Sequence, residues 1–351
     1  MSIFETLDVQ GHEHLVFWCD LDVGYRGVIA VHDTSLGPAM GGTRFWDYGS
    51  EDDAVADALR LSRAMTYKAA AAGLDAGGGK AVILGHHPRP DREALFRAHG
   101  RDVESLCGRY ITAEDVGTSA DDMEFVRRET RYVTGLHGLS GDPSPMTALG
   151  TLEAIRAAAT EVYGDGSLDG VRIAVQGVGN VGFHLCDLLS REGARLMVTD
   201  IDSAKVERAV EAFEAEAVGQ DEIYSVEAEV FAPCALGGVI RSDTLPLLRV
   251  DIVAGAANNQ LADPSYAEAL QGLGILYAPD YVGNAGGLIS IYGELHGWES
   301  SQASERIRGI FGTMKGVFEL ARREGVNPST AADQLAEARL REARNARGIR
   351  S

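Results

Sequence analysis

The segment VRIAVQGVGNVG constrains the fold of this chain more than any other part of it. An apolar run leads into three glycines with GxGxxG spacing, Gly177, Gly179 and Gly182, and a helical pattern begins directly after them. In a strand, turn and helix of this kind, the first glycine permits the turn, the second lets a pyrophosphate approach the backbone, and the third allows strand and helix to pack closely. The segment therefore predicts one unit of a parallel α/β sheet.

An acidic residue follows these glycines at the distance that a dinucleotide site requires. Asp200 ends the next apolar run, RLMVTD, about 20 residues on, where a carboxylate can accept hydrogen bonds from the adenosine ribose. A carboxylate there disfavours a 2′-phosphate, so the pattern favours NAD over NADP. A glycine-rich turn without a ligand is the alternative, and the complete arrangement argues against it. The predicted cofactor-binding residues of this turn are Gly177, Gly179, Asn180, Val181, Gly182 and Asp200.

The chain is long enough for two domains, because 351 residues exceed the usual size of a single hydrophobic core. A cluster of Gly, Ser and Pro at 136–147 breaks both periodicities and predicts the domain junction. We expect an α/β domain over 1–140 and a Rossmann-like domain over 141–325. A C-terminal helix within 326–351 is expected to pack back on the first domain.

Apolar periodicity predicts the individual elements. Before the junction, the expected strands are 27–34, 80–85 and 109–118, and the expected helices are 50–73, with Ser50 as N-cap, and 91–108. After the junction, besides the elements around the glycine turn, we expect a helix at 147–163, strands at 229–234, 251–257 and 274–280, one long helix from Ser304 to Arg323, and a last helix at 329–346.

Composition excludes several classes of protein. The formal charge of −20 repels a phosphate backbone, which makes nucleic acid an unsuitable partner. The four cysteines form no CxxC pair and the nine histidines show no HExxH spacing, so no structural metal is predicted. Neither a signal segment nor an apolar run long enough to span a membrane is found, so we expect a cytoplasmic protein without a membrane partner.

A second polar site is predicted in the first half of the chain. Lys68 and Lys80 lie at the ends of predicted elements among small residues, in MTYKAAAAG and GGGKAVILG, and Asp115 follows a predicted strand. For either lysine alone, a solvated charge is the plainer interpretation. A lysine that is desolvated beside a second cation has its ammonium form disfavoured, which lowers its pKa toward the range of a general base.

Several motifs together resemble one family. The motifs GPAMGGTRFW, MTYKAAAAGLDAGGGK, GDPSPMTALG, QGVGNVG and APDYVGNAGG, in this order, resemble the amino acid dehydrogenases that include the glutamate, leucine, valine and phenylalanine enzymes, with leucine dehydrogenase the nearest. The resemblance implies NAD-dependent oxidative deamination of an L-amino acid to a 2-oxo acid and ammonium. It also implies a two-domain α/β fold, an N-terminal substrate domain and a Rossmann-like NAD domain with the active-site cleft between them, and a homo-oligomer, from dimer to octamer.

The resemblance also assigns roles to residues. Lys80 would be the base that activates water, and Asp115 would exchange protons with the substrate nitrogen. Lys68 would bind the substrate carboxylate, with Asn284 as a second contact. The glycines beside Lys80 would let substrate and nicotinamide come close to its amine. The remaining implied contacts are Gly41 and Gly42 for the substrate and Thr147 and Asn259 for the nicotinamide end of the cofactor.

The same resemblance implies an apolar side-chain pocket formed by Met40, Ala113, Leu288 and Ile291. A carboxylate left unpaired in such a pocket would cost several kcal/mol, so glutamate is excluded and a branched-chain or aliphatic amino acid (leucine, valine or isoleucine) is the expected substrate. Phenylalanine or another bulky apolar amino acid is the alternative. These side chains could also be ordinary core.

Two other functions are compatible with a dinucleotide fold. A hydroxy-acid dehydrogenase would need a His or Lys general acid, and no histidine lies within the site motifs. The other is an NAD-binding protein that keeps the fold without turnover, which the fold alone does not distinguish from an enzyme. The presence of Lys68, Lys80 and Asp115 together argues against it.

Overall fold

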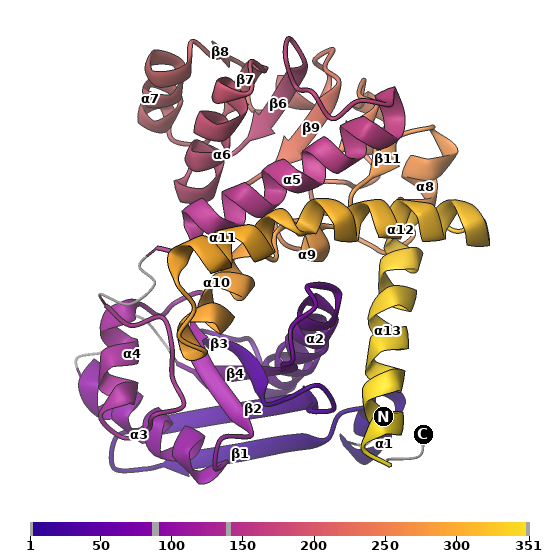
Figure 1. Cartoon of the computed structure of the whole chain (residues 1–351). Coiled ribbons are helices and arrows are strands. Elements are labelled where there is room, and N and C mark those ends of the chain that lie inside the picture. The colour runs from indigo at the N-terminus through magenta and orange to yellow at the C-terminus, as the bar shows by residue number, and fades with distance from the viewer. Residues whose placement is uncertain (1–2, 86–90, 138–141, 349–351) are drawn as a thin grey trace. The chain divides into compact units, whose positions relative to one another are not determined.

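The computed structural model describes residues 3–85, 91–137 and 142–348, and Figure 1 shows its elements. The chain forms two compact units: Met1–Gly141 with Glu294–Gly297 and Ala336–Ser351, and Asp142–Gly293 with Trp298–Leu335. The predicted junction falls partly on 138–141, outside the described residues. The last helix enters the first unit only from Ala336, ten residues later than the expected limit at 326.

The first unit is built on a five-stranded mixed sheet in the order β1-β2-β4-β3-β5. The antiparallel pairs are β1 with β2 and β2 with β4, whereas β3 runs parallel to both β4 and β5. The strands are β1 His14–Asp20, β2 Tyr25–Asp33, β3 Ala39–Trp46, β4 Gly77–Leu84 and β5 Tyr110–Glu114.

Helices cover both faces of this sheet. They are α1 Ile3–Gln10, α2 Glu51–Ala71, α3 Arg92–Ser105 and α4 Ala120–Arg127. The predicted start of α2 is confirmed, because the Ser50 side chain accepts a hydrogen bond from the Asp53 backbone N–H. On one face, α2 packs its small residues against β2 and β4 in a cluster formed by Val28, Ala30, Ala54, Ala58, Leu59 and Val82. The larger aromatic cluster, with Phe45 and Phe96, involves α3 and α4.

The three glycines before Lys80 lie in a strand, which begins three residues before the expected strand at 80–85. They open β4, and none of them has a positive φ. A Cβ on Gly78 would lie 2.1 Å from the backbone nitrogen of Thr66 in α2, and one on Gly79 would lie 2.6 Å from the Tyr110 ring. The glycines therefore serve close packing of helix and sheet, and the expectation that they make room for ligands is wrong for these two positions.

The second unit is built on a six-stranded sheet in the order β11-β10-β9-β6-β7-β8, and all its pairs are parallel. Counted from the first strand of this sheet, β6, the order is 3-2-1-4-5-6, that of the doubly wound dinucleotide-binding fold. The strands are β6 Arg172–Gln176, β7 Arg195–Thr199, β8 Glu216–Ala217, β9 Val230–Pro233, β10 Ile252–Val253 and β11 Leu276–Tyr277. The chain order of the strands reverses between β6 and β9, and ligands bind at such a point.

The helices of the second unit differ from expectation in one division, and four helices within 203–295 were not expected individually. The long helix expected from Ser304 to Arg323 is two helices, α11 Ser300–Arg308 and α12 Ile310–Glu324, which meet at Gly309. The other helices are α5 Ser144–Tyr163, α6 Asn180–Arg191, α7 Ser203–Phe213, α8 Tyr266–Gly272, α9 Asp280–Gly283 and α10 Gly286–Leu295, with short 3₁₀ turns at Glu222–Tyr224 and Leu245–Leu247.

The last helix, α13 Pro328–Ala346, contributes its second half to the core of the first unit. Ala336 and Leu340 are buried together with Ala70 at the end of α2. Arg339 donates to the carbonyl oxygen of Ala70 at 3.0 Å and to Asp75 at 2.8 Å. The packing of this segment on the first unit therefore combines apolar and polar contacts.

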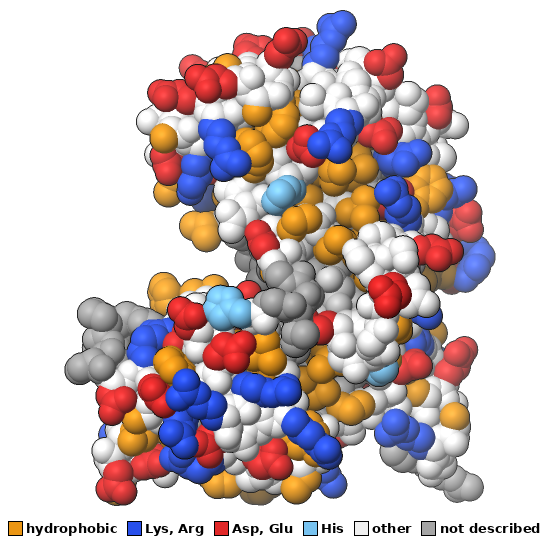
Figure 2. Space-filling view, turned by 60° about the vertical axis from the view of Figure 1, so that its left-hand side comes forward, with side chains coloured by type: hydrophobic (Ala, Val, Ile, Leu, Met, Phe, Trp, Pro, Cys, Tyr) orange, Lys and Arg blue, Asp and Glu red, His pale blue; other side chains and the backbone are white. Residues whose placement is uncertain are grey.

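The surface shows carboxylates and basic groups side by side. On the face shown in Figure 2, acidic and basic side chains are interspersed instead of being gathered by sign. The four cysteines are free thiols. Within the described ranges, every helix is too short or too polar to cross a membrane.

Candidate active site

One face of the first sheet gathers most of the residues that the sequence predicts for the substrate site. In β3, Met40, Gly42 and Arg44 alternate and therefore share a face. Gly42 is the register partner of Ala113 on β5. Arg44 is the register partner of Val82 on β4, and Val82 faces the same side as Lys80, two residues before it. Met40, Ala113 and Lys80 thus lie on the same face, where Met40 and Ala113 are buried.

Lys80 and Asp115 form an ion pair on this face. The Lys80 Nζ lies 2.7 Å from Asp115 Oδ2, and Lys80 is only 5% exposed. Asp115 follows β5, and its backbone N–H donates to the Thr118 hydroxyl at 2.8 Å, which fixes the turn after the strand. The structure therefore brings together the two residues that the sequence assigned to proton transfer.

Burial and charge shift the pKa of both groups. Burial lowers the pKa of the Lys80 amine below its ordinary value, and the Arg44 cation acts in the same direction against the opposing Asp115 charge. For Asp115, burial would raise the pKa of the carboxyl, but Lys80 and Arg44 outweigh it and hold that pKa below its usual range. The pair thus couples an ionised carboxylate to an amine that loses its proton more readily than a solvated lysine.

Arg44 is a member of this cluster that the sequence analysis missed. Its Nε lies 2.9 Å from Asp115 Oδ2, and its terminal nitrogen lies 2.7 Å from Asp57 Oδ2 on α2. Arg44 belongs to GGTRFW, two residues after Gly42, so strand alternation could have placed it on the face of Gly42. The predicted second cation, Lys68, lies half-buried in the last turn of α2.

The two predicted substrate glycines are needed by the backbone. A Cβ on Gly41 would lie 1.8 Å from the carbonyl oxygen of Gly79, and one on Gly42 would lie 2.8 Å from the Asp115 Cβ. The carbonyl of Gly41 also accepts a hydrogen bond from the Tyr110 hydroxyl at 2.6 Å. The absence of a side chain at Gly42 is therefore what allows Asp115 to approach the sheet.

The second unit holds the glycine turn at the end of β6. Gly177 has a φ of +95°, which glycine adopts without strain. A Cβ on Gly182 would lie 2.0 Å from the carbonyl oxygen of Gly177, so only glycine fits between turn and helix. A Cβ on Gly179 would meet no atom within 4 Å, so the turn has open space there, as a pyrophosphate at the N-terminus of α6 requires.

Asp200 lies directly after β7 and is tied to the glycine turn. Its Oδ2 accepts a hydrogen bond from the Val178 backbone N–H at 2.9 Å, and its Oδ1 accepts one from the Asp202 N–H at 3.0 Å. Each carboxylate oxygen has a further lone pair, so both can still accept from ribose hydroxyls. At the start of α6, Asn180 is exposed and Val181 is half-buried.

The remaining predicted residues of the second unit lie on three elements. Thr147 is in the first turn of α5, and Asn259, with a φ of +52°, lies on the loop after β10 and accepts from the Gly238 N–H at 2.7 Å. Asn284 is 3% exposed and donates to the carbonyl oxygen of Ala256 at 3.0 Å and to Asn258 Oδ1 at 2.8 Å. Both amide protons of Asn284 are thus in use, and contact with a carboxylate would require one of these bonds to break.

Two predicted pocket residues lie on α10. Leu288 is buried and Ile291 is half-buried, and their spacing of three residues places them on one side of the helix. Met40 and Ala113 belong to the first unit, whereas these two belong to the second.

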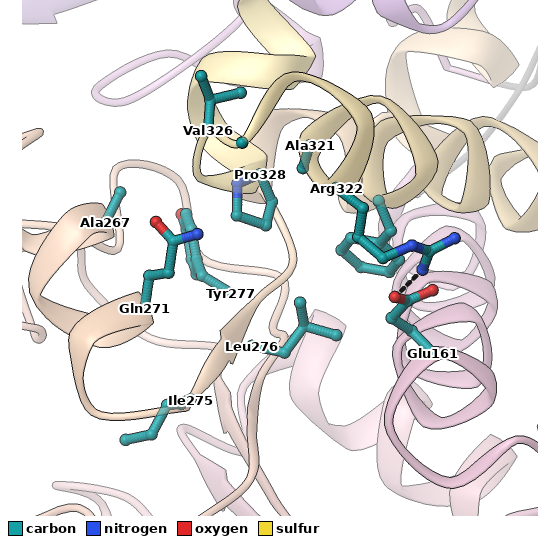
Figure 3. Close-up of a pocket in the computed structure, with 12 residues that line it drawn as sticks. Glu161, Ala267, Gln271, Ile275, Leu276, Tyr277, Ala321, Arg322, Val326 and Pro328 are labelled. Atoms are coloured by element: carbon teal, nitrogen blue, oxygen red, sulfur yellow. Dashed lines mark hydrogen bonds and ion pairs between the residues drawn. The ribbon is translucent and has the colours of Figure 1, made fainter.

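A separate pocket lies beside β11, at the edge of the second sheet (Figure 3). Its volume is about 310 Å³, and the Glu161–Arg322 ion pair forms part of its wall with apolar side chains such as Leu276 and Val326. None of the predicted site residues lines it. Across the described residues, no group of three His, Cys, Asp or Glu side chains is arranged to hold a metal ion.

Comparisons with known proteins match both units of the chain. The model of the Glu/Leu/Phe/Val dehydrogenase dimerisation domain matches residues 16–132, and the Glutamate/Leucine/Phenylalanine/Valine dehydrogenase model matches residues 138–206 and 197–348. Leucine dehydrogenase of Geobacillus stearothermophilus is 50% identical over 350 residues, covering 99% of this chain and 95% of that protein. Leucine dehydrogenase of Bacillus subtilis is 49% identical over 350 residues, with 99% and 96% covered.

A solved structure extends the likeness to the fold. The crystal structure of L-tryptophan dehydrogenase from Nostoc punctiforme has a TM-score of 0.88 and 44% identity, covering 98% of this chain and 100% of that one. The family matches span both units, including the strand of Lys80 and the glycine turn of Gly179. This chain is therefore an amino acid dehydrogenase that belongs to the Glu/Leu/Phe/Val dehydrogenase family.

Proposed function

We propose that the protein catalyses the oxidative deamination of a branched-chain or aliphatic L-amino acid, such as leucine, valine or isoleucine, with NAD as the hydride acceptor. The observation that supports it most is the ion pair of the buried Lys80 with the half-buried Asp115, on the sheet face that also holds Met40. Amino acid, NAD and water give the 2-oxo acid, ammonium, NADH and a proton, so the step needs no other reactant. We assign the dinucleotide to the glycine turn, with the open space at Gly179 and the carboxylate of Asp200 as the groups that fit it.

Each polar residue of the first unit has a defined task in this proposal. Bound NAD would supply the acceptor for the hydride that leaves the substrate Cα, and the substrate would become an imine. Lys80 in its neutral form accepts a proton from the water that attacks the imine carbon, and Asp115 exchanges protons with the substrate nitrogen. Lys68 pairs with the substrate carboxylate, since a cation opposite a carboxylate gives orientation as well as charge-assisted hydrogen bonds. The lowered pKa of Lys80 supports its role as a base.

The substrate preference rests on apolar residues. Met40 has no charge to pair with a side-chain carboxylate, and an unpaired carboxylate there would cost several kcal/mol. A methionine can adapt its shape, so a bulkier substrate is the second candidate. The likeness to the L-tryptophan dehydrogenase from Nostoc punctiforme favours including aromatic amino acids. Because the model of the family's dimerisation domain matches this chain, we also expect a homo-oligomer.

The test is NADH or NADPH formation at alkaline pH by the purified protein with leucine, valine, isoleucine, phenylalanine, tryptophan and glutamate. We expect turnover on the aliphatic amino acids with NAD and none on glutamate. Faster turnover on the aromatic amino acids would favour the second candidate. Turnover on glutamate would contradict the assignment of Met40, and no turnover on any of them would contradict the proposed function.

A further inference from the structure

Two cations hold Asp115 at the same carboxylate oxygen. Lys80 Nζ lies 2.7 Å from Oδ2, and Arg44 Nε lies 2.9 Å from that oxygen. Within the part of the chain that the structure describes, no hydrogen bond reaches Oδ1. Since both oxygens of a carboxylate accept hydrogen bonds, this geometry anchors one oxygen and leaves the other for a further donor.

Arg44 is itself fixed at its far end. Its terminal nitrogen lies 2.7 Å from Asp57 Oδ2, and the same oxygen accepts from the Tyr48 hydroxyl at 2.7 Å. Arg60 binds the other oxygen of Asp57 at 2.7 Å. The Arg44 side chain is only 21% exposed, so this planar group is braced between α2 and the turn after β5.

We propose that Arg44 is a positioning residue for the amino acid oxidation. It holds Oδ2 of Asp115 beside Lys80, so that Oδ1 remains available to exchange protons with the substrate nitrogen. This inference rests on the proposed function. Arg44 acts through Asp115 and need not touch the substrate, and Asp57 holds the far end of its guanidinium.

The charge of Arg44 also bears on both members of the pair. Arg44 lowers the pKa of Asp115 and the pKa of Lys80. The other titratable groups around the pair are Asp57 and Arg60 on α2, Tyr48 after β3 and Tyr110 on β5. Removal of the Arg44 cation would raise both pKa values, so the neutral form of Lys80 would be reached only at higher pH.

Two substitutions separate geometry from charge. In Arg44→Met, we expect kcat to fall roughly 100-fold with KM changed less than about 3-fold, because the lost contact serves the transition state more than substrate binding. We also expect the acidic limb of the pH–rate profile to move about one pH unit toward alkaline pH. In Arg44→Lys, the charge remains, but a single ammonium nitrogen replaces the two separated nitrogens that reach Asp115 and Asp57, so we expect kcat to fall while the acidic limb moves much less.

Arg60→Gln is the matched control. Arg60 binds the same Asp57 but does not contact Asp115, and its side chain is 54% exposed. We expect kcat within about twofold of the wild type and an unchanged limb. Thermal unfolding of all three variants would show whether a loss of rate reflects a loss of fold. A folded Arg44→Met with unchanged kcat and limb, or an Arg60→Gln with the same defects, would overturn the proposal.

A measurement without turnover keeps this inference separate from the proposed function. Carbamylation of Lys80 by cyanate, followed by peptide mass spectrometry over a range of pH, reports the ionisation of the amine in the intact chain. We expect the midpoint of labelling to lie at higher pH in Arg44→Met than in the wild type. An inactive wild type with this shift would contradict the proposed function alone, whereas equal midpoints would contradict the effect of Arg44.

Discussion

At the scale of single residues, burial changes what Lys80 can do. An amine that is 5% exposed and lies 2.7 Å from one carboxylate has a lowered pKa, because burial outweighs the attraction of Asp115. Since the proposed base must be neutral, we expect kcat for deamination to rise with pH through an apparent pKa below the 10.5 of an ordinary lysine. Lys80→Ala should lower kcat by a factor of roughly 10² to 10⁴. Steady-state kinetics over pH would test both statements, with unimpaired NAD binding as the control.

Asp200 offers a second residue-scale test. Its carboxylate accepts from Val178 and Asp202 and can still accept from a ribose. Asp200→Ser removes the charge that repels a 2′-phosphate. We therefore expect weaker NAD binding, and we expect the preference for NAD over NADP to fall by about tenfold or more. Asp202→Asn, at the N-cap of α7, is the comparison, because it changes a neighbouring acid that caps a helix. Equal preference in wild type and Asp200→Ser would mean that the acid does not contact the cofactor.

At the scale of elements, substitutions at two glycines of the same turn should have different effects, one on stability and the other on cofactor binding. A Cβ on Gly182 would lie 2.0 Å from a backbone oxygen, whereas one on Gly179 would meet no protein atom within 4 Å. We therefore expect Gly182→Ala to destabilise the second unit by roughly 1 to 3 kcal/mol. Gly179→Ala should unfold as the wild type does but bind NADH at least tenfold more weakly, since its methyl group would occupy the space assigned to the pyrophosphate. Thermal unfolding and NADH fluorescence titration would distinguish the two; normal binding by Gly179→Ala would place the cofactor elsewhere.

At the scale of the whole molecule, the end of the chain stabilises its beginning. Asp33 in β2 is 2% exposed and pairs with Arg344 in α13, whose Nε lies 3.2 Å from Asp33 Oδ2. The Ser35 N–H donates to the other oxygen at 2.6 Å. Arg344→Met should destabilise the protein by about 2 kcal/mol, less than for a fully buried pair because the Arg344 side chain is 36% exposed. Chemical denaturation would measure this loss, and Asp33→Asn in the same chain should restore part of it.

The same pair predicts a pH dependence. Burial would raise the pKa of Asp33, but the hydrogen bonds from Arg344 and Ser35 outweigh it and leave that pKa below its model-compound value of 3.8. A depressed folded pKa contributes stability above the unfolded value, and this stability is lost as pH falls through the folded value. The destabilisation by Arg344→Met should therefore be present at neutral pH and shrink below about pH 4. A constant difference down to pH 2 would contradict this origin.

The sequence predicted some elements of the fold and missed others. The N-cap of α2 and the strand, turn and helix at Gly177 depend on neighbours within a few residues, and both were predicted. The division of α11 and α12 at Gly309 was missed, because glycine interrupts a helical pattern without revealing whether the helix ends. The packing role of the glycines in GGGK was not predicted, because the sequence could not show that Thr66 and Tyr110 lie where side chains at these glycines would be.

The sequence alone determined the class of fold, the dinucleotide turn and the chemical character of the site, because these depend on periodicity and on residue types at fixed spacing. The assignment of Lys80 and Asp115 to proton transfer also followed from it, but only through resemblance to a family. The tertiary structure alone decided that Arg44 and Asp57 complete the cluster and that Asp33 meets Arg344, 311 residues away. Such contacts arise from sheet register and helix packing, which bring distant side chains together and leave no local pattern in the chain.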